Sequence, residues 1–204
     1  MGPRQIQKFR FRSRTVATIA LSLVATTGIV NAHAATPKHS LHSELLTIGQ
    51  MPKGWSVPAR SDVVNVKCLA SILVTNGTTS ASIAQAVFGQ GGELPAVAEK
   101  LETTSNASSV YSKTVITLAS CKHLSGTING FNVSGSVKPM STRRYGTESQ
   151  AFHVAISMLG VPAAIDVQVI REGNVITWFD AANFAPVNVT QFKSLIAKAF
   201  TKIR

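Results

Sequence analysis

The chain has 204 residues, and its 20 Lys and Arg against nine Asp and Glu give a formal net charge of +11 at pH 7. Aromatic residues make up only 6% of the chain and do not alternate with the basic ones, which argues against a nucleic-acid-binding protein. No internal repeat, linker or low-complexity tract interrupts the sequence, so we expect one structured domain.

The first 34 residues have the three parts of a secretory signal peptide. Five basic residues and no acidic ones precede an apolar run over 16–30, and Ala32-His33-Ala34 then places small residues at the two positions that signal peptidase recognises. A membrane anchor is the alternative, but the run has about 15 residues, fewer than the roughly 20 that a membrane-spanning helix needs. We predict a cleavable signal peptide over 1–34.

Cleavage leaves residues 35–204, which suffice for one domain with a substantial core. It removes five of the 20 basic residues and none of the nine acidic ones, so the net charge falls from +11 to +6. No cysteine follows the signal directly, so we expect a freely secreted protein without a lipid anchor and without stable membrane insertion.

Cys68 and Cys121 are the two cysteines. Thiols outside the cytoplasm are usually oxidised in pairs, and two cysteines allow one pairing. A metal-binding pair or a nucleophilic thiol is the alternative, but neither cysteine has the CxxC or Cys–His context of such sites. We predict a Cys68–Cys121 disulfide, which would stabilise the fold by about 4 kcal/mol in the chain-entropy model.

The first half of the domain is expected to be mostly helical. Apolar residues at helical spacing predict a short helix over 41–50, and the apolar stretch over 66–74 predicts a second one. Residues 80–88 fit a strand or a helix. Further helices are expected over 94–101 and 108–120.

The second half alternates apolar and polar residues, which is typical of strands that bury one face. This pattern predicts a β-meander with strands over 131–137, 151–158, 165–170 and 175–180. Turns are expected at Gly160 and Pro162 and over 171–174. A closing amphipathic helix follows, with Asn188 as its N-cap and Phe192 and Ile196 on its apolar face.

Helices gathered before and after an antiparallel sheet predict the α+β class. We therefore expect a central antiparallel sheet flanked by helices, an αβ sandwich, cross-linked by one disulfide. The apolar face of the closing helix is expected to pack on the sheet rather than to bind a membrane.

Several short motifs occur in a distinctive order and spacing. They are Leu45-Leu46, Met51-Pro52-Lys53-Gly54-Trp55, Cys68-Leu69-Ala70, Ala86-Val87-Phe88, Cys121, Gly146-Thr147-Glu148-Ser149 and Arg171-Glu172-Gly173-Asn174-Val175, followed by the closing helix. With them, essentially all of 41–204 resembles the PknH-like extracellular sensor domain family of actinobacteria, with the related secreted or lipid-anchored LpqN-type proteins.

The resemblance implies a central antiparallel sheet flanked by helices, a cleft for a ligand, an extracytoplasmic location in the bacterial cell envelope and no catalytic residues. The chain departs from the kinase form because it has neither a kinase domain nor a transmembrane helix, and because it has one cysteine pair where the kinase sensor has two. It also lacks the lipid-site cysteine of LpqN-type relatives.

The sequence contains no GxSxG, HExxH or phosphate-binding Gly-rich motif. His39 and His42 could share a helical face, but a metal site needs more ligands, so we expect no metal and no cofactor. The candidate ligand-binding residues are Arg143, Arg144 and Tyr145 in a loop, with His153 on the small-residue face of the next strand.

Two guanidinium groups beside a phenol can bind phosphate, sulfate or carboxylate. The alternatives are a solvated basic loop and a histidine with a purely structural role. Neighbouring residues of an extended loop also tend to point in opposite directions, which would keep the two guanidinium groups from a shared ligand.

We predict a secreted, extracytoplasmic, sensor-like domain without catalytic activity. Its partner is expected to be an anionic or cell-envelope ligand or a protein, and not nucleic acid. The alternative is a secreted hydrolase whose site is assembled only in three dimensions, and a pocket holding a His or carboxylate with a strongly shifted pKa would favour it.

Overall fold

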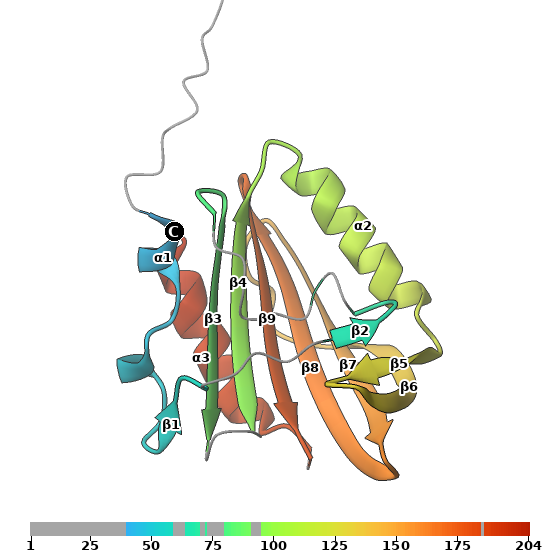
Figure 1. The fold of residues 1–204 in the computed structure, drawn as a ribbon. Coiled ribbons are helices and arrows are strands. Elements are labelled where there is room, and N and C mark those ends of the chain that lie inside the picture. Colours follow the sequence, from blue (N-terminus) through green and yellow to red (C-terminus); the bar gives the residue numbers. More distant parts are fainter. Residues whose placement is uncertain (1–39, 59–63, 70–71, 73–79, 91–94, 185) are drawn as a thin grey trace, which may run out of the picture. The chain divides into compact units, whose positions relative to one another are not determined.

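A nine-stranded antiparallel sheet forms the body of the domain, with the strand order β1-β3-β4-β9-β8-β7-β6-β5-β2. The sheet curls like half of a barrel, with α2 on one side of it and α3 on the other (Figure 1). The elements are α1 (Leu41–Glu44), the 3₁₀ turn η1 (Ile48–Gln50), β1 (Trp55–Ser56), β2 (Val64–Val66), β3 (Ile83–Gln90), β4 (Ala96–Thr103), α2 (Ala107–Ser120), β5 (Leu124–Ile128), β6 (Phe131–Met140), β7 (Glu148–Met158), β8 (Val161–Glu172), β9 (Val175–Asn183) and α3 (Val189–Lys202).

This computed structural model describes residues 40–58, 64–69, 72, 80–90, 95–184 and 186–204. All of them belong to one compact unit, which spans Pro37–Arg204. The predicted signal peptide and its cleavage site lie outside the described residues. Within the described ranges, no helix is long and apolar enough to cross a membrane.

The fold is largely β, which corrects the predicted αβ sandwich. The described part contains nine strands but three α-helices, of four, 14 and 14 residues. The main error is the helix predicted over 94–101, because residues 96–101 lie in β4. Its Ala, Glu, Lys and Leu residues favour helices locally, but β4 pairs with β3 and β9 along its length, and Glu99 and Leu101 are fully buried. Pairing and burial therefore outweigh the local preference.

The other predictions for the first half have mixed outcomes. The described part of 66–74 holds the end of β2 and turns instead of a helix, and 41–50 is helical only over α1 and η1. Residues 80–88 adopt the strand alternative, as most of β3. The helix predicted over 108–120 is confirmed as α2.

The second half follows the prediction closely. β6 to β9 form the predicted meander, and each strand pairs antiparallel with the next. The closing helix is confirmed as α3, and the Asn188 side chain accepts a hydrogen bond from the Gln191 N–H at 3.0 Å. The sequence did not predict β5, a short strand of Ser, Gly and Thr residues between Leu124 and Ile128.

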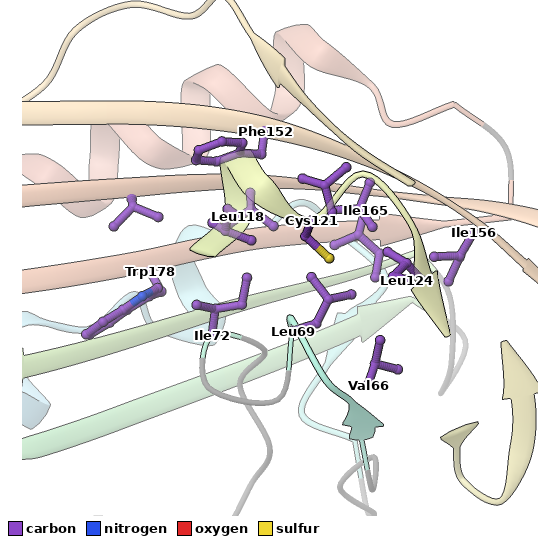
Figure 2. Close-up of a cluster of buried hydrophobic side chains, with 14 of the residues drawn as sticks. Val66, Leu69, Ile72, Leu118, Cys121, Leu124, Phe152, Ile156, Ile165 and Trp178 are labelled. Atoms are coloured by element: carbon purple, nitrogen blue, oxygen red, sulfur yellow. The ribbon is translucent and has the colours of Figure 1, made fainter. Parts of the chain in front are cut away.

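The two faces of the sheet bury separate sets of side chains, which we call the α2 side and the α3 side. On the α2 side, Trp178 and Phe152 pack with Leu118 of α2 and with Leu69 and Ile72, which follow β2 (Figure 2). On the α3 side, buried residues of β3, β4, β8 and β9 pack against α3. Because helices and loops cover both faces, β8 and β9 are buried on both sides over most of their length.

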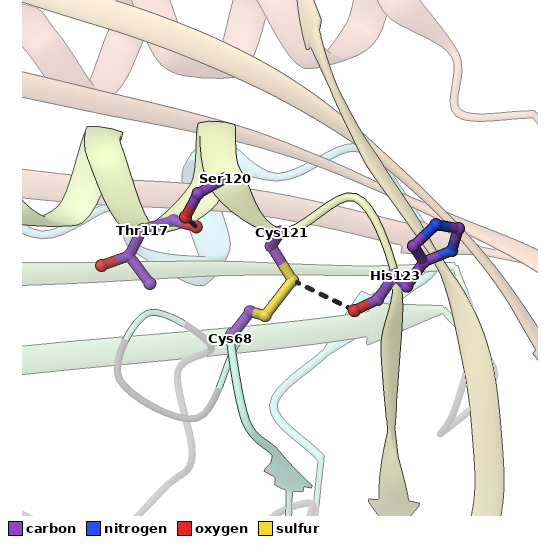
Figure 3. The surroundings of a disulfide bond; sticks show 5 residues. All are labelled: Cys68, Thr117, Ser120, Cys121 and His123. Atoms are coloured by element: carbon purple, nitrogen blue, oxygen red, sulfur yellow. Dashed lines mark hydrogen bonds between the residues drawn. A yellow bond between two sulfur atoms is a disulfide. The ribbon is translucent and has the colours of Figure 1, made fainter.

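The predicted Cys68–Cys121 disulfide is confirmed, with a Cα–Cα distance of 6.1 Å. It joins the end of α2 to the turn that follows β2 (Figure 3). The His123 carbonyl oxygen lies 4.0 Å from the Cys121 sulfur. Since a disulfide sulfur carries no proton, this is a packing contact, and the covalent bond is what ties α2 to the β2 segment.

Candidate functional site

The α3 side of the sheet is only partly covered. The hydrophobic cluster under α3 takes its buried strand residues from β3, β4, β8 and β9, with the partly buried Trp55 of β1 and Met140 of β6, and it contains no residue of β7. On this side β7 presents, at alternating positions, Ser149, Ala151, His153, Ala155 and Ser157. The His153 side chain is 42% exposed. A strip of polar and small residues therefore lies beside α3 along β7, buried at Ala151 and open to solvent from His153 onward.

The loop between β6 and β7 forms one end of this strip, and Tyr145 fixes it to α3. Tyr145 is buried, its ring meets the Phe200 ring edge-on at 5.6 Å, and its hydroxyl donates to the Lys193 carbonyl oxygen at 3.4 Å. Tyr145 therefore packs the loop against α3, so the structure places it in the core instead of leaving its phenol free for a ligand.

Gln168 of β8 secures the same loop from below. Its side chain is fully buried, its amide nitrogen donates to the Ser149 hydroxyl, and its amide oxygen accepts from the Thr142 hydroxyl at 2.7 Å. Because its hydrogen-bonding groups are satisfied in this way, burial of the amide is not penalised. The buried Gln168 side chain and its two hydrogen bonds thus form a polar layer, which we call the polar floor, beneath the loop.

A cleft of about 290 Å³ opens above this floor. Its lining is Met140, Ser141, Thr142, Arg143, Arg144, Ser149, Gln150 and Ala151. Both arginines that the sequence singled out belong to this cleft, and both are exposed. His153 lies two residues beyond Ala151 on the same face of β7, so it continues the strip that leads out of the cleft.

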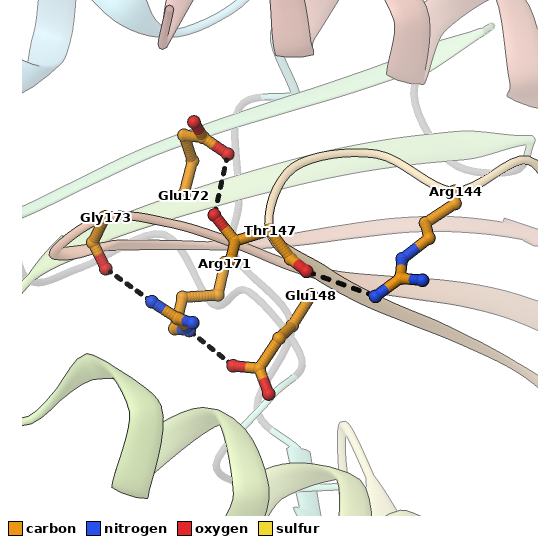
Figure 4. Close-up of polar contacts among 6 residues, drawn as sticks. All are labelled: Arg144, Thr147, Glu148, Arg171, Glu172 and Gly173. Carbon is orange, nitrogen blue, oxygen red and sulfur yellow. Dashed lines mark hydrogen bonds and ion pairs between the residues drawn. The ribbon is translucent and has the colours of Figure 1, made fainter.

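The two arginines of the cleft make different contacts. The Arg143 guanidinium lies 5.8 Å from the centre of the Tyr145 ring, on the α3 side. Arg144 donates to the Thr147 carbonyl oxygen at 3.3 Å (Figure 4). The pKa of Tyr111 on α2 is raised by burial and by Glu148, and Arg144 and Arg171 act to lower it. The charge of Arg144 thus reaches the α2 side.

A carboxylate network lies beside the cleft and pairs with other groups than these two arginines. Glu148 forms an ion pair with Arg171, which also donates to the Gly173 carbonyl oxygen, and Glu172 accepts from the Thr147 hydroxyl (Figure 4). In the part of the chain that the structure describes, no ion pair joins Arg143 or Arg144 to a carboxylate. Neither guanidinium is therefore neutralised by a direct ion pair within the described residues, which makes the cleft a candidate site for an anion.

His153 forms a close pair with Asp166 of β8. Nδ1 of His153 lies 2.6 Å from Oδ1 of Asp166, and the carboxylate is only 4% exposed while the imidazole is 42% exposed. The buried carboxylate fixes the ring and leaves Nε2 on the open side. Lys138 of β6 is the neighbour of His153 on its other flank and is exposed. A cation and an imidazole therefore stand side by side on the strip.

The sequence did not predict a site role for Asp166, Gln168, Ser149 or Thr142. A signal for the first was present: His153 and Asp166 are equally distant from the two-residue turn Leu159-Gly160, so the hairpin register must pair them. Gln168 is paired with Ala151 by the same register. Nothing local marks Thr142, because its role depends on the course of the loop.

Two further carboxyl groups are buried away from the cleft. Burial raises the pKa of Glu99 to about 7, against a hydrogen bond from the Leu46 N–H and the charge of Lys202, which act in the opposite direction. Burial alone raises the pKa of Asp180 to about 8. Neither lines the cleft. The described residues contain no group of three or more His, Cys, Asp or Glu that could hold a metal ion.

Comparison with known proteins gives a structural similarity and no sequence family. No protein-family model and no curated protein matches the chain. The fold is similar to the crystal structure of the extracellular domain of PknH from Mycobacterium tuberculosis, with a TM-score of 0.57 and 13% sequence identity over 78% of this chain and 92% of that one. At this identity the similarity shows the fold alone.

Proposed function

We propose that this chain is a secreted, extracytoplasmic, sensor-like domain that binds an anionic ligand and catalyses no reaction. The fold of the PknH extracellular domain and the disulfide support an extracellular location, because disulfides persist in oxidising compartments. The observation that carries the ligand class is the cleft with Arg143 and Arg144, neither of which forms an ion pair with a carboxylate of the described part.

The ligand is expected to be a small or extended anion such as a phosphorylated or sulfated glycan of the cell envelope. One guanidinium on each side of the loop suits a ligand that passes over the loop better than one held in a single bidentate grip. Lys138 and His153 can extend the contact along β7. A protein partner with an acidic segment would use the same charges.

The test uses soluble anions, inositol hexakisphosphate and a sulfated disaccharide, at two salt concentrations. Arg143→Ala together with Arg144→Ala should weaken binding at least tenfold, and salt should weaken binding by the unchanged protein, because the contact is electrostatic. Lys113→Ala with Lys122→Ala, two exposed cations elsewhere, removes the same charge and should have a much smaller effect. Equal affinity of all three proteins would refute the anion site.

Hydrolysis is the second candidate, and the His153–Asp166 pair is the observation that favours it. A buried carboxylate that orients an exposed imidazole is the arrangement of a general base. Within the described residues, however, no Ser, Thr or Cys side chain hydrogen-bonds the His153 ring. Turnover of aryl ester or phosphodiester substrates that is lost in His153→Ala would establish the hydrolase and overturn the non-catalytic proposal.

A further inference from the structure

Two neighbouring hairpins carry exposed apolar side chains at one end of the sheet. Asn129-Gly130 joins β5 to β6, and Leu159-Gly160 joins β7 to β8. Because Val133 of β6 pairs with Met158 of β7, both turns lie at the same end of the sheet. The exposed residues, which we call the apolar tip, are Phe131 (49% exposed), Leu159 (72%) and Val161 (49%).

The apolar tip continues the core of the α2 side outward. Phe131 pairs with Ile128 and Val161 pairs with Met158, and both partners pack against the hydrophobic cluster of the α2 side. The three exposed side chains are therefore the outer margin of a continuous apolar surface, supported from beneath.

The backbone at Leu159 is held in an uncommon conformation. Two-residue hairpin turns require positive φ at the central residues, which Asn, Asp and Gly tolerate best. The β5–β6 turn obeys this rule, with Asn129 at φ 51° and Gly130 at φ 81°. In the β7–β8 turn the same place is taken by Leu159, at φ 52°. A strained leucine that is also the most exposed residue of the apolar tip points to a role in binding, since packing does not explain it.

Neither hairpin carries a charge. Residues 124–137 and 154–165 contain no Asp, Glu, Lys or Arg. The strands remain paired up to both turns, where Ile128 faces Phe131 and Met158 faces Val161. Such hairpins can enter an apolar medium without taking along a charge or an unpaired strand backbone.

We propose that the apolar tip inserts reversibly into a lipid layer, at the boundary between the headgroups and the acyl chains. A second protein copy is a poorer occupant, because the three exposed side chains offer on the order of 300 Å², against about 800 Å² that each partner of a stable complex buries. Three apolar side chains on paired, uncharged hairpins instead suit a shallow, reversible lipid contact.

The position of the apolar tip fits this role. It lies at the opposite end of β7 from the anion cleft, and the 11 residues of β7 span about 35 Å. A domain that touches lipid with its apolar tip would therefore keep the cleft open to water. The proposal does not rest on the anion site, since the two surfaces share no residue.

Vesicles of phosphatidylcholine are the appropriate probe, because anionic lipids would attract a basic protein whatever its apolar tip does. The secreted form of the chain is mixed with vesicles, and the bound fraction is measured by sedimentation. We expect measurable binding that falls roughly fivefold in Leu159→Asn and again in Phe131→Ser, because each removes apolar area from the contact. Ile116→Ser, at an exposed residue of α2, should bind like the unchanged protein.

Leu159→Asn separates binding from folding. Because Asn favours positive φ, this variant should unfold at the same or a higher temperature while it binds vesicles more weakly. The proposal is overturned if the unchanged protein does not bind, or if Leu159→Asn with Phe131→Ser binds equally well. Self-association that this double variant abolishes, without vesicle binding, would assign the apolar tip to a second copy instead. None of these outcomes affects the anion site, which is tested with soluble ligands.

Discussion

The two sides of the sheet hold their helices by different means. α2 and α3 each have 14 residues. α3 buries Phe192, Leu195, Ile196, Ala199 and Phe200, whereas α2 buries only Ala107, Tyr111 and Leu118. α2 has in addition the disulfide at its end, which links it to the segment after β2. The covalent bond thus supplies on the α2 side what apolar burial supplies on the α3 side.

The largest effect is expected on the α3 side. Phe192 is 1% exposed and packs against Phe179 with ring centres 5.6 Å apart. Phe192→Ala should lower the free energy of unfolding by about 3–5 kcal/mol, because it leaves a cavity where an aromatic ring was buried. Urea denaturation measures this, and Val189→Ala on the same helix, at an exposed position, is the control. A loss below about 1 kcal/mol would mean that α3 contributes little to the fold.

The α2 side should respond most to loss of the disulfide. Cys68→Ser with Cys121→Ser should destabilise the fold by about 2–4 kcal/mol. Native-state hydrogen exchange should show the effect locally, because α2 has fewer buried side chains than α3. Amides of α2 should exchange faster while those of α3 keep most of their protection. If both helices lost protection equally, the disulfide would stabilise the whole domain and not the α2 side in particular.

The same contrast explains what the sequence could predict of the fold. α3 is held by burial of one face, so its sequence carries apolar residues at helical spacing. β6 to β9 carry the alternation of apolar and polar residues that is typical of strands. β4 does not, since both of its faces are covered: Glu99 is buried on the α3 side, and on the α2 side Lys100 lies 4.4 Å from the Trp178 ring. Charged residues at such places follow from tertiary contacts that no local pattern contains.

The candidate site was predictable in part for a related reason. Arg143 and Arg144 stand in a loop, where charge is visible in the sequence, and both do line a cleft. The burial of Tyr145 depends on α3, which lies far along the chain. The partnership of His153 with Asp166 depends on the hairpin register, and it follows once the turn is placed at Leu159-Gly160.

Each side of the sheet also holds one buried carboxyl group, and the two groups should affect the stability of the fold over different pH ranges. Asp180 pairs in register with Val167 of the α2-side cluster, and its Oδ1 has no hydrogen-bond partner among the residues that the structure describes. Glu99, on the α3 side, accepts the Leu46 N–H. Burial raises both pKa values, to about 8 for Asp180 and about 7 for Glu99, so the folded protein holds protons that the unfolded chain releases above about pH 4.

Stability should therefore be greatest below about pH 4, fall as pH rises above that value, and level off once pH passes the folded pKa values. Between pH 7 and 9 the fall should come mainly from Asp180 and amount to about 1.4 kcal/mol. Urea denaturation at these two pH values measures it. Asp180→Asn should abolish most of the difference and Glu99→Gln should keep most of it. The reverse result would place the higher pKa on the α3 side.

The smallest effect concerns the beginnings of the two helices, and it offers a matched pair. Both N-cap residues are exposed asparagines. The side chain of Asn188 accepts the Gln191 N–H at the start of α3, whereas the side chain of Asn106 makes no capping hydrogen bond at the start of α2. Asn188→Ala should therefore destabilise the fold by about 1 kcal/mol, and Asn106→Ala should stay within about 0.5 kcal/mol of the unchanged protein.

Asn188→Asp should restore or exceed the original stability, because a carboxylate accepts the same hydrogen bond and also favours the positive end of the helix dipole. Thermal unfolding of the three variants decides the matter. Equal losses from both alanine changes would mean that the two helices begin with equally effective caps, so that the contrast between the two sides would be confined to side-chain burial and the disulfide.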